Sequence, residues 1–458
     1  MTQSQPKPVI FICLIFFPAL LSCTVIAQQI SAVDNYALNR PGVVMVKTVF
    51  SANVYVKNMK IDNRRFNLLL DSIQRIDTNG IVFTAEQKLD IVLKEMNNNP
   101  SRFFKPTYDY IKQPEEITAT GTGFFITGDG FVATNSHLTD RDNAFIRRHF
   151  ILSAFQQITD ANINALEQSW ATTFTEQQRS LLYNTYASVY SRLFSMVLND
   201  LRKNIYIVYR KDSSDRISFT ETKSASVIIK GSPMPGKDVA ILKIDSVNNL
   251  PTLKINSPQL PRVGEQVYVF GYPAPVTNND FVSAESSIEP TLTTGIVSAV
   301  KKSVNGWPVL QMDANINHGS SGGPVCNSNG EVIGLTTFGS IENNGNLAAG
   351  LNFAIPVSIL KDFLDSINVA PALSKTTILF QEGLDCFNQH YYRKALGSFE
   401  KIKKLDNNYP TADYYITICK TKIDNGEDRT TKTIKESLLI LVFILLALIL
   451  FIAFRRKK

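Results

Sequence analysis

The sequence predicts a mainly β protein that is interrupted and followed by helices, and three observations support this fold class. First, residues 205–358 contain short runs of β-branched and aromatic residues, with turn signals roughly every 8 to 12 residues, which is typical of an antiparallel barrel or sandwich. Second, the hydrophobic period becomes helical within residues 140–202 and again after Pro371. Third, the chain has 458 residues, 44% of them hydrophobic and 19% charged, which is enough for two or three domains with a sizeable core.

The predicted strands begin near the N-terminus. Val43–Val56 is rich in Val, Phe and Tyr. Phe124–Thr127 and Phe131–Thr134 flank Gly128-Asp129-Gly130, and Asp-Gly between two such runs predicts a hairpin. Further strands are expected at Ile205–Tyr209, Ala225–Ile229, Val239–Ile244, Gln266–Phe270, Gly295–Val300, Val309–Met312 and Val332–Thr336.

Two helical insertions are predicted, at about residues 58–115 and 140–202. Thr84-Ala-Glu-Gln87 and Thr175-Glu-Gln-Gln178 both have the capping-box pattern of a helix start. One helical face of the second insertion is expected to carry Leu182, Tyr186, Val189, Leu193 and Val197. We interpret the aromatic residues of this insertion as helix packing, and a substrate-gating or partner-binding lid is the alternative.

A helical segment is predicted over residues 372–426. Gly383, Ala395 and Phe399 recur at the spacing of a tetratricopeptide repeat, and Tyr409-Pro410 precedes another helix. One and a half repeats bury little surface alone. We therefore expect this segment to pack on the rest of the chain, on a second copy or on a protein partner.

The N-terminus has the pattern of a secretory signal, predicted over residues 1–27. Lys7 precedes an apolar run from Val9 to Leu21. Val25-Ile-Ala27 offers a signal peptidase site, whereas Leu20-Leu21-Ser22-Cys23 resembles the lipobox of a lipoprotein. An uncleaved anchor is the third alternative.

The C-terminus has the pattern of a single transmembrane helix, predicted over residues 437–454. Leu438–Phe454 contains no charged residue and approaches the length that spans a bilayer core of about 30 Å. Residues 455–458 are all cationic and should form a cytoplasmic tail. With a secreted N-terminus, this topology places the body of the protein outside the cytoplasm.

Charge and cysteine content argue against nucleic-acid binding and against a disulfide framework. The net charge is +7, but Lys7 and the four terminal cations supply most of it, so the region between is nearly balanced and nucleic-acid binding is not favoured. The five cysteines show no CxxC pair and no metal-ligand spacing, so we predict neither a disulfide framework nor a metal or other cofactor. For Cys386 and Cys419, two buried thiols are one alternative and a bridge between them is the other.

Three residues have the chemistry and setting of a nucleophilic site. His137 follows the predicted hairpin, and Asp238 lies at the entry to a predicted strand. Ser321 lies within Asn317-His-Gly-Ser-Ser-Gly-Gly-Pro-Val325, where small residues allow a tight turn that aims backbone N–H groups at one point. Acyl transfer by serine needs these groups: a base, an orienting carboxylate, a hydroxyl and oxyanion donors.

These segments resemble the trypsin-like serine proteases of the HtrA (Deg) type. The resemblance rests on GTGFFITGDGFVATNSHL, KDVAILKID and QMDANINHGSSGGPV, and further on VGEQVYVFGYP, TTGIVSAV and GLNFAIPV. It implies a chymotrypsin-like double β-barrel over residues 38–368 and serine endopeptidase activity. It also implies that Ser321 is the nucleophile, that His137 is the general base oriented by Asp238, and that the N–H groups of Gly319 and Ser321 form the oxyanion hole.

The sequence departs from the family pattern in four ways. Ser320 replaces the usual Asn, and His318 replaces the usual Pro. A long insertion separates His137 from Asp238, and we expect tetratricopeptide-like helices and a membrane anchor in place of the family's PDZ module. By the resemblance, Asn315 forms the base of the specificity pocket. Because Asn315 is not acidic, cleavage after a small or medium apolar residue is expected rather than after Lys or Arg.

The prediction is therefore a serine endopeptidase anchored in a bacterial cytoplasmic membrane, with its protease domain facing the periplasm or outside. Its substrates would be extracytoplasmic polypeptides, and its terminal helices would recruit a partner or support self-association. The alternative is a catalytically silent or partner-activated protease-fold module, with the helical insertions covering the cleft until a partner binds.

Overall fold

The computed structural model describes residues 30–78, 82–192, 196–213, 218–256, 258–274, 283, 286–341, 347–430, 442–446 and 449. The predicted signal peptide, residues 1–27, and the basic tail, residues 455–458, lie outside the described residues. The predicted transmembrane helix, residues 437–454, lies mostly outside them. Among the residues that are described, no helix combines the length and the apolar character needed to span a bilayer.

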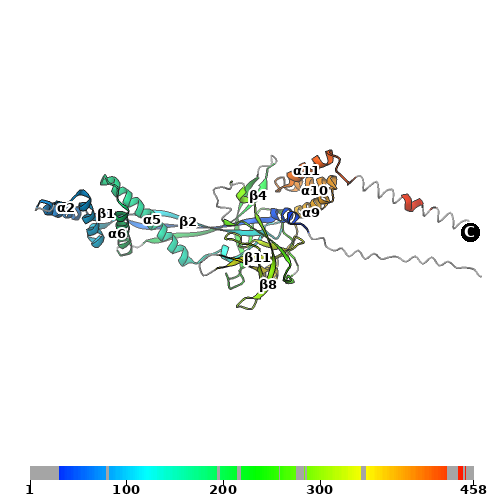
Figure 1. Ribbon diagram of the computed structural model, residues 1–458, viewed down its shortest axis with the longest axis horizontal. Helices are drawn as coiled ribbons and strands as arrows, with labels where there is room; N and C mark the ends of the chain where they lie inside the picture. Colours follow the sequence, from blue (N-terminus) through cyan, green and yellow to red (C-terminus); the bar gives the residue numbers. More distant parts are fainter. Residues whose placement is uncertain are drawn as a thin grey trace, which may run out of the picture.

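Two closed antiparallel barrels form the centre of the molecule (Figure 1). The strand order is β1-β2-β3-β6-β5-β4 in the first barrel and β10-β11-β12-β9-β8-β7 in the second. The first barrel consists of β1 (Val43–Ile61), β2 (Phe104–Phe125), β3 (Phe131–Thr134), β4 (Val197–Asp212), β5 (Ser218–Lys230) and β6 (Ala240–Ile244). The second consists of β7 (Gln266–Gly271), β8 (Thr291–Lys302), β9 (Pro308–Met312), β10 (Pro324–Cys326), β11 (Val332–Ile341) and β12 (Leu347–Pro356). The predicted β-barrel fold with additional helices is confirmed.

The strand predictions hold for most of the two barrels. The predicted hairpin is β2-β3, with Phe124 opposite Ala133. Every strand expected from Ile205 onward lies within an observed strand, apart from Val239 one residue before β6. β10 and β12 are not among the predicted strands. β10 has only three residues, which is too short to show an alternating pattern.

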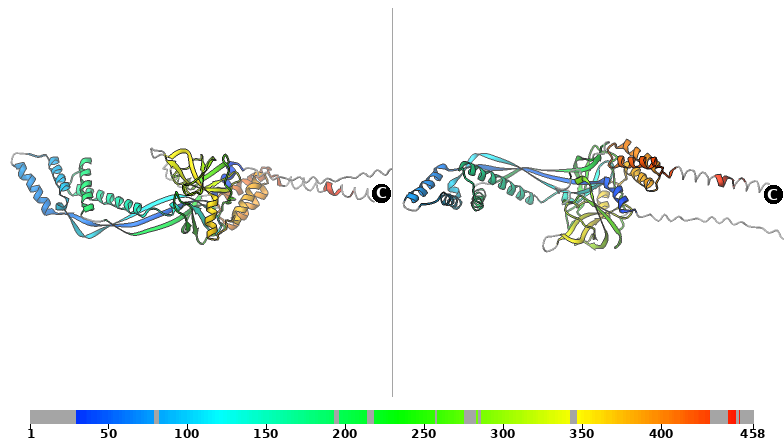
Figure 2. Two further views of the ribbon diagram at one scale, coloured as in Figure 1. Left: turned by 90° about the horizontal axis from the view of Figure 1, so that it is seen from below. Right: turned by 45° about the horizontal axis from the view of Figure 1, so that its top comes forward.

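Three strands of the first barrel continue beyond it as an arm (Figures 1 and 2). β1 pairs with β2 along its whole length, out to Ile61 opposite Phe104, and with β4 out to Tyr55 opposite Val197. Residues 104–115 and 197–202 are therefore strand, although the sequence predicts helical insertions there. Val197, which was expected on a helical face, instead begins β4 with its side chain 45% exposed.

Helices cover the arm and fill its far end. They are α2 (Asn63–Thr78), α3 (Ala85–Asn98), α4 (Pro100–Phe103), α5 (Asn143–Ser169) and α6 (Glu176–Arg192). Both predicted capping boxes form, at Thr84 with Gln87 and at Thr175 with Gln178. We call these five helices and the part of the arm that they cover the distal lobe.

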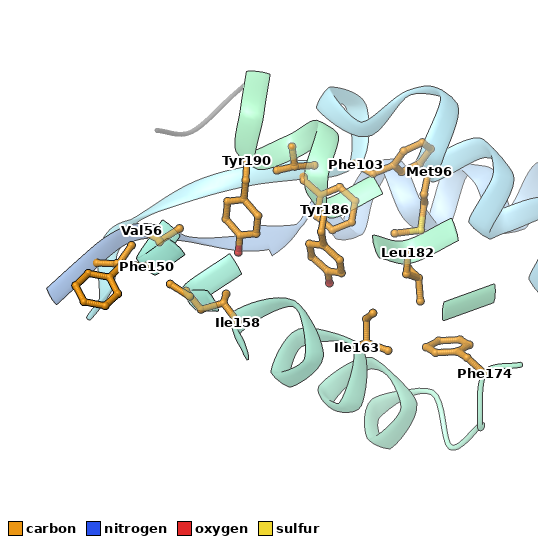
Figure 3. Packing of buried hydrophobic residues seen from close by; sticks show 14 of the residues in the cluster. Val56, Met96, Phe103, Phe150, Ile158, Ile163, Phe174, Leu182, Tyr186 and Tyr190 are labelled. Carbon is orange, nitrogen blue, oxygen red and sulfur yellow. The ribbon is translucent and has the colours of Figure 1, made fainter. Parts of the chain in front are cut away.

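The distal lobe has a hydrophobic core of its own (Figure 3). Val56 of β1, Phe150 and Ile163 of α5 and Tyr186 of α6 belong to one buried cluster that is separate from the barrel cores. Tyr186 and Tyr190 are buried in this cluster and Tyr183 packs against it, so these aromatic residues pack between helices, as interpreted from the sequence. Most of the lobe projects away from the barrels (Figure 2), which does not favour the alternative in which the insertions cover the cleft.

Further helices precede or follow the barrel strands in the chain. They are α1 (Ala32–Asn39), α8 (Val357–Ser366), α9 (Lys375–Asn388), α10 (Tyr392–Leu405) and α11 (Ala412–Asp424), with single 3₁₀ turns η1 (Arg40–Gly42), η2 (Ser136–Leu138) and η3 (Ser286–Ile288). α9 and α10 form the predicted pair, and a Cβ on Gly383 would lie 2.6 Å from the Phe399 ring, which explains the glycine. The tetratricopeptide assignment itself stays a prediction.

Buried hydrogen bonds join the C-terminal helices to the loop between β6 and β7 and to the end of β4. Thr252 N–H donates to Thr377 Oγ1 of α9 at 2.7 Å, and Thr411 N–H, just before α11, donates to Asp212 Oδ2 of β4 at 2.7 Å. Of the three packing arrangements expected from the sequence, packing on the rest of the chain is observed. Cys386 and Cys419 are free thiols, so the optional bridge between them is absent.

Candidate active site

His137, Asp238 and Ser321 meet where the two barrels face each other. His137 lies in η2, which follows β3 after one residue, and Asp238 lies two residues before β6, so both belong to the first barrel. Ser321 lies in the turn that leads into β10 of the second barrel. Residues that are far apart in the sequence are therefore carried to one place by the ends of short strands.

Asp238 holds His137 by two hydrogen bonds. Asp238 Oδ2 lies 2.7 Å from the ring nitrogen Nδ1, and the backbone N–H of His137 donates to Oδ1 at 2.9 Å. The carboxylate is 1% exposed, whereas 37% of the imidazole is accessible. A carboxylate on Nδ1 favours the tautomer with its proton there, which leaves the Nε2 lone pair as a base.

Neighbouring side chains fix the loops that carry this pair. Asn135 Nδ2 donates to the main-chain oxygen of Asp238 at 2.8 Å, and Ser136 Oγ donates to Gly231 O at 2.6 Å. Both side chains stand next to His137 in the sequence and tie η2 to the loop before β6. The sequence analysis quoted both residues within a motif without assigning them this role.

Thr337 of β11 links Ser321 to Asp238. Its hydroxyl donates to Asp238 Oδ2 at 3.0 Å, and its carbonyl accepts a hydrogen bond from Ser321 Oγ at 3.0 Å. No hydrogen bond joins Ser321 to His137 in the described structure. Sequence reasoning missed Thr337, because a threonine directly after a predicted strand carries no signal of its own.

The backbone of the serine turn, residues 318–321, is held at every carbonyl group. In chain order, the donors are the N–H of Ala274 to His318, the hydroxyl of Thr122 to Gly319, the hydroxyl of Thr336 and the N–H of Gly323 to Ser320, and the N–H of Thr122 to Ser321. Among the described residues, no acceptor faces the N–H groups of Gly319 and Ser321. These are the two amides predicted to bind an oxyanion, and they can donate to a ligand.

Gly319 is required by both conformation and space. Its φ is +96°, in the region that favours glycine, and a Cβ there would lie 2.2 Å from Tyr272 O. The backbone of the serine turn therefore packs directly against the backbone at Tyr272, just after the end of β7.

The other two residues singled out in this loop lie at the surface. Asn315 and His318 are both exposed. The main-chain oxygen of Asn315 accepts a hydrogen bond from Thr293 Oγ1 at 2.8 Å, and its role in specificity stays a prediction. Within the described residues, no group of three His, Cys, Asp or Glu side chains could hold a metal ion.

Parts of the chain are similar in sequence to known proteins. Residues 121–335 match the family model of the trypsin-like peptidase domain. The serine endoprotease DegS of Salmonella typhimurium is 35% identical over 135 residues, which cover 28% of this chain and 35% of DegS. A probable periplasmic serine endoprotease, DegP-like, of Rhizobium meliloti is 26% identical over 252 residues, which cover 54% of this chain and 33% of the relative.

The chain spans about a third of the length of these relatives. A solved structure, the HtrA-type protease AlgW with decapeptide, is 17% identical to this chain. The match covers 74% of this chain and 68% of AlgW, with a TM-score of 0.36. The sequence matches support a hydrolase of the serine endopeptidase class.

Proposed function

We propose that the chain is a serine endopeptidase in which Ser321 is the nucleophile, His137 the general base and Asp238 the carboxylate that orients the imidazole. The observation that carries the proposal is the buried Asp238, which hydrogen-bonds both the ring and the backbone of His137 and, through Thr337, reaches Ser321. Nucleophilic catalysis needs a base within reach of the hydroxyl, and these contacts connect His137 and Ser321 to the same carboxylate.

The proposed reaction begins with a rotation of the Ser321 side chain. Its Oγ leaves Thr337 O and turns to His137 Nε2, which takes the proton as Oγ bonds to the peptide carbonyl carbon. The N–H groups of Gly319 and Ser321 donate to the resulting oxyanion. His137 then protonates the leaving amine as the C–N bond breaks, and a water molecule, deprotonated by His137, hydrolyses the acyl-enzyme and restores the serine.

We further propose that this protease is anchored in a bacterial cytoplasmic membrane by residues 437–454 and acts on extracytoplasmic polypeptides. The apolar C-terminal run, the signal-like N-terminus and the similarity to the probable periplasmic endoprotease of Rhizobium meliloti support this location. The terminal helices would serve partners or self-association through the surface that the barrels leave uncovered.

A partner-activated enzyme or a silent binding module is the second candidate. It is favoured by one observation: Ser321 Oγ donates to Thr337 O rather than to His137. Rotation of a serine hydroxyl costs little free energy, so this contact alone does not decide between the candidates. They differ in whether Ser321 reacts in the isolated protein, and labelling of the serine measures that.

The test uses the full-length protein in detergent. A fluorophosphonate probe should label the wild type at Ser321, and Ser321→Ala should remove both labelling and casein cleavage, by more than about 10³-fold. Mass spectrometry of the labelled peptide distinguishes Ser321 from Ser320, and an unchanged melting curve shows that S321A is folded.

The other outcomes discriminate equally well. Retained casein cleavage by S321A would refute the assignment of the nucleophile. A folded wild type that is never labelled would establish the silent module. Labelling that appears only after addition of a substrate peptide would establish the partner-activated form.

A further inference from the structure

Thr122, near the end of β2, is the one residue that bonds the serine turn through both its backbone and its side chain among the described residues. It is fully buried. Its N–H donates to Ser321 O at 2.8 Å, and its hydroxyl donates to Gly319 O at 2.7 Å. The same hydroxyl accepts a hydrogen bond from Tyr272 N–H at 3.0 Å.

The bonds to His318 O and Ser320 O set the direction of the two free amides, those of Gly319 and Ser321, and the bond to Gly319 O sets the other peptide unit of Gly319. A trans peptide unit is planar, and its C=O and N–H point in opposite directions. Fixing the carbonyl groups of residues 318–321 therefore fixes the N–H groups of the residues that follow them. Gly319, without a Cβ, would otherwise rotate over a wide range of φ, so its peptide units depend most on outside support.

The Thr122 hydroxyl supports Gly319 from both sides. It binds Gly319 O directly, on the peptide unit that follows this glycine. It also holds Tyr272, and two residues later Ala274 N–H donates to His318 O at 2.6 Å, on the peptide unit that precedes the glycine. One hydroxyl thus connects both peptide units of Gly319 to β2.

We propose that the hydroxyl of Thr122 is a positioning group that aims the Gly319 N–H at the substrate oxyanion. This inference rests on the proposed function of the serine turn. Thr122 touches no substrate, so it acts on the rate through Gly319 and should leave substrate binding largely unchanged. Its methyl group has no part in this role.

The experiment compares Thr122→Val, which keeps the shape and removes the hydroxyl, with Thr122→Ser, which keeps the hydroxyl. In full-length protein, T122V should slow fluorophosphonate labelling of Ser321 and lower kcat for casein by about 10- to 100-fold, less than the loss of a whole oxyanion donor. KM should change by less than about 3-fold, because the ground-state contacts remain. T122S should stay within about 3-fold of the wild type.

A matched control separates this effect from a general loss of stability. Thr376 of α9 is also fully buried, and its hydroxyl donates to a backbone carbonyl, that of Asn249, at 2.6 Å, outside the site. Thr376→Val should lower the melting temperature as T122V does and leave the labelling rate unchanged.

Several results would overturn the inference. They are equal labelling rates for T122V and the wild type, a rise in KM with kcat unchanged, or the same loss in T122S as in T122V. If T122V does not fold, Thr122→Ala is compared with T122S, since these differ by the hydroxyl alone, and equal rates would overturn it. A folded wild type that is never labelled would overturn the proposed function, and the inference with it.

Discussion

The barrel junction and the distal lobe are stabilised in different ways. At the junction, individual hydrogen bonds join buried polar groups from distant parts of the chain, such as the bond from Thr122 to Gly319, 197 positions apart. In the lobe, helices pack apolar side chains into one cluster around Phe150 and Ile163. Directional bonds fail when a single atom moves, whereas an apolar cluster loses stability in proportion to the volume removed. Activity and lobe stability should therefore respond to different substitutions.

The largest effect is expected from Gly319→Ala. The new Cβ would lie 2.2 Å from Tyr272 O, at a φ of +96°, so the serine turn must shift and both oxyanion donors lose their aim. Proteolysis should fall by about 10³-fold, equivalent to about 4 kcal/mol at the barrier. The measurement is the rate of fluorophosphonate labelling in full-length protein.

Gly306→Ala is the matched control for Gly319→Ala. Gly306 also has a positive φ, +85°, but a Cβ there meets no atom within 4 Å. The G306A variant therefore has the backbone strain without the steric clash, and strain alone costs only about 1 kcal/mol of stability. The labelling rate should stay within about 2-fold of the wild type. A similar loss in both variants would show that strain, and not the displaced turn, lowers activity.

A smaller effect, confined to the lobe, is expected from Ile163→Ala. Ile163 is fully buried in α5, so its truncation should destabilise the lobe by about 3 kcal/mol. Hydrogen exchange should show faster opening of α5 and α6, while the labelling rate of Ser321 at 25 °C stays within about 2-fold of the wild type.

The control for Ile163→Ala lies on the same helix. Leu152 is 54% exposed, and Leu152→Ala should leave exchange in the lobe almost unchanged. If I163A slowed labelling while the barrels kept their protection, the two regions would be coupled, and their separation as described above would be wrong.

The smallest effect, about 1 to 2 kcal/mol, is expected from Asp212→Asn, where β4 meets the C-terminal helices. Burial alone would raise the pKa of Asp212, but hydrogen bonds from Arg210 and Thr411 lower it below the ordinary 3.8. A depressed folded-state pKa gives stability that is complete above the unfolded pKa and is lost as the pH falls through the folded one.

The wild type should therefore exceed D212N in unfolding free energy at neutral pH, and the difference should shrink below about pH 4. Urea unfolding at a series of pH values measures it. Asp362→Asn is the control, because the Asp362 carboxylate pairs with Lys237 at the surface and is 64% exposed, so no change is expected. A difference between wild type and D212N that is independent of pH would contradict the role of the ionised carboxylate.

The sequence predicts local features well where one pattern decides them. The β2-β3 hairpin follows from Asp-Gly between two apolar runs, and both capping boxes follow from a Thr and a Gln three residues apart. The arm could not be foreseen. The outer part of β2 reads FKPTYDYIKQPEE, whose prolines and charges are tolerated because its other edge carries no strand.

The same limit applies to the candidate site. His137, Asp238 and Ser321 were found from motifs, and the structure brings them to one place. Thr122 and Thr337 were not assigned a role, because a threonine in or beside a strand is unremarkable until the fold shows which carbonyl or carboxylate its hydroxyl faces. Hydrogen bonds between distant segments are a property of the assembled barrels.

The arm extends from one side of the barrels (Figure 1). α1 and α11 lie on the side of the barrels opposite the distal lobe (Figure 1). β2 alone, with 22 residues, measures about 70 Å at the usual rise of a strand. Tethering on that side of the barrels would point the lobe outward from the tethering surface. Anything bound at the lobe tip would be kept several nanometres from that surface, with the candidate active site between the two.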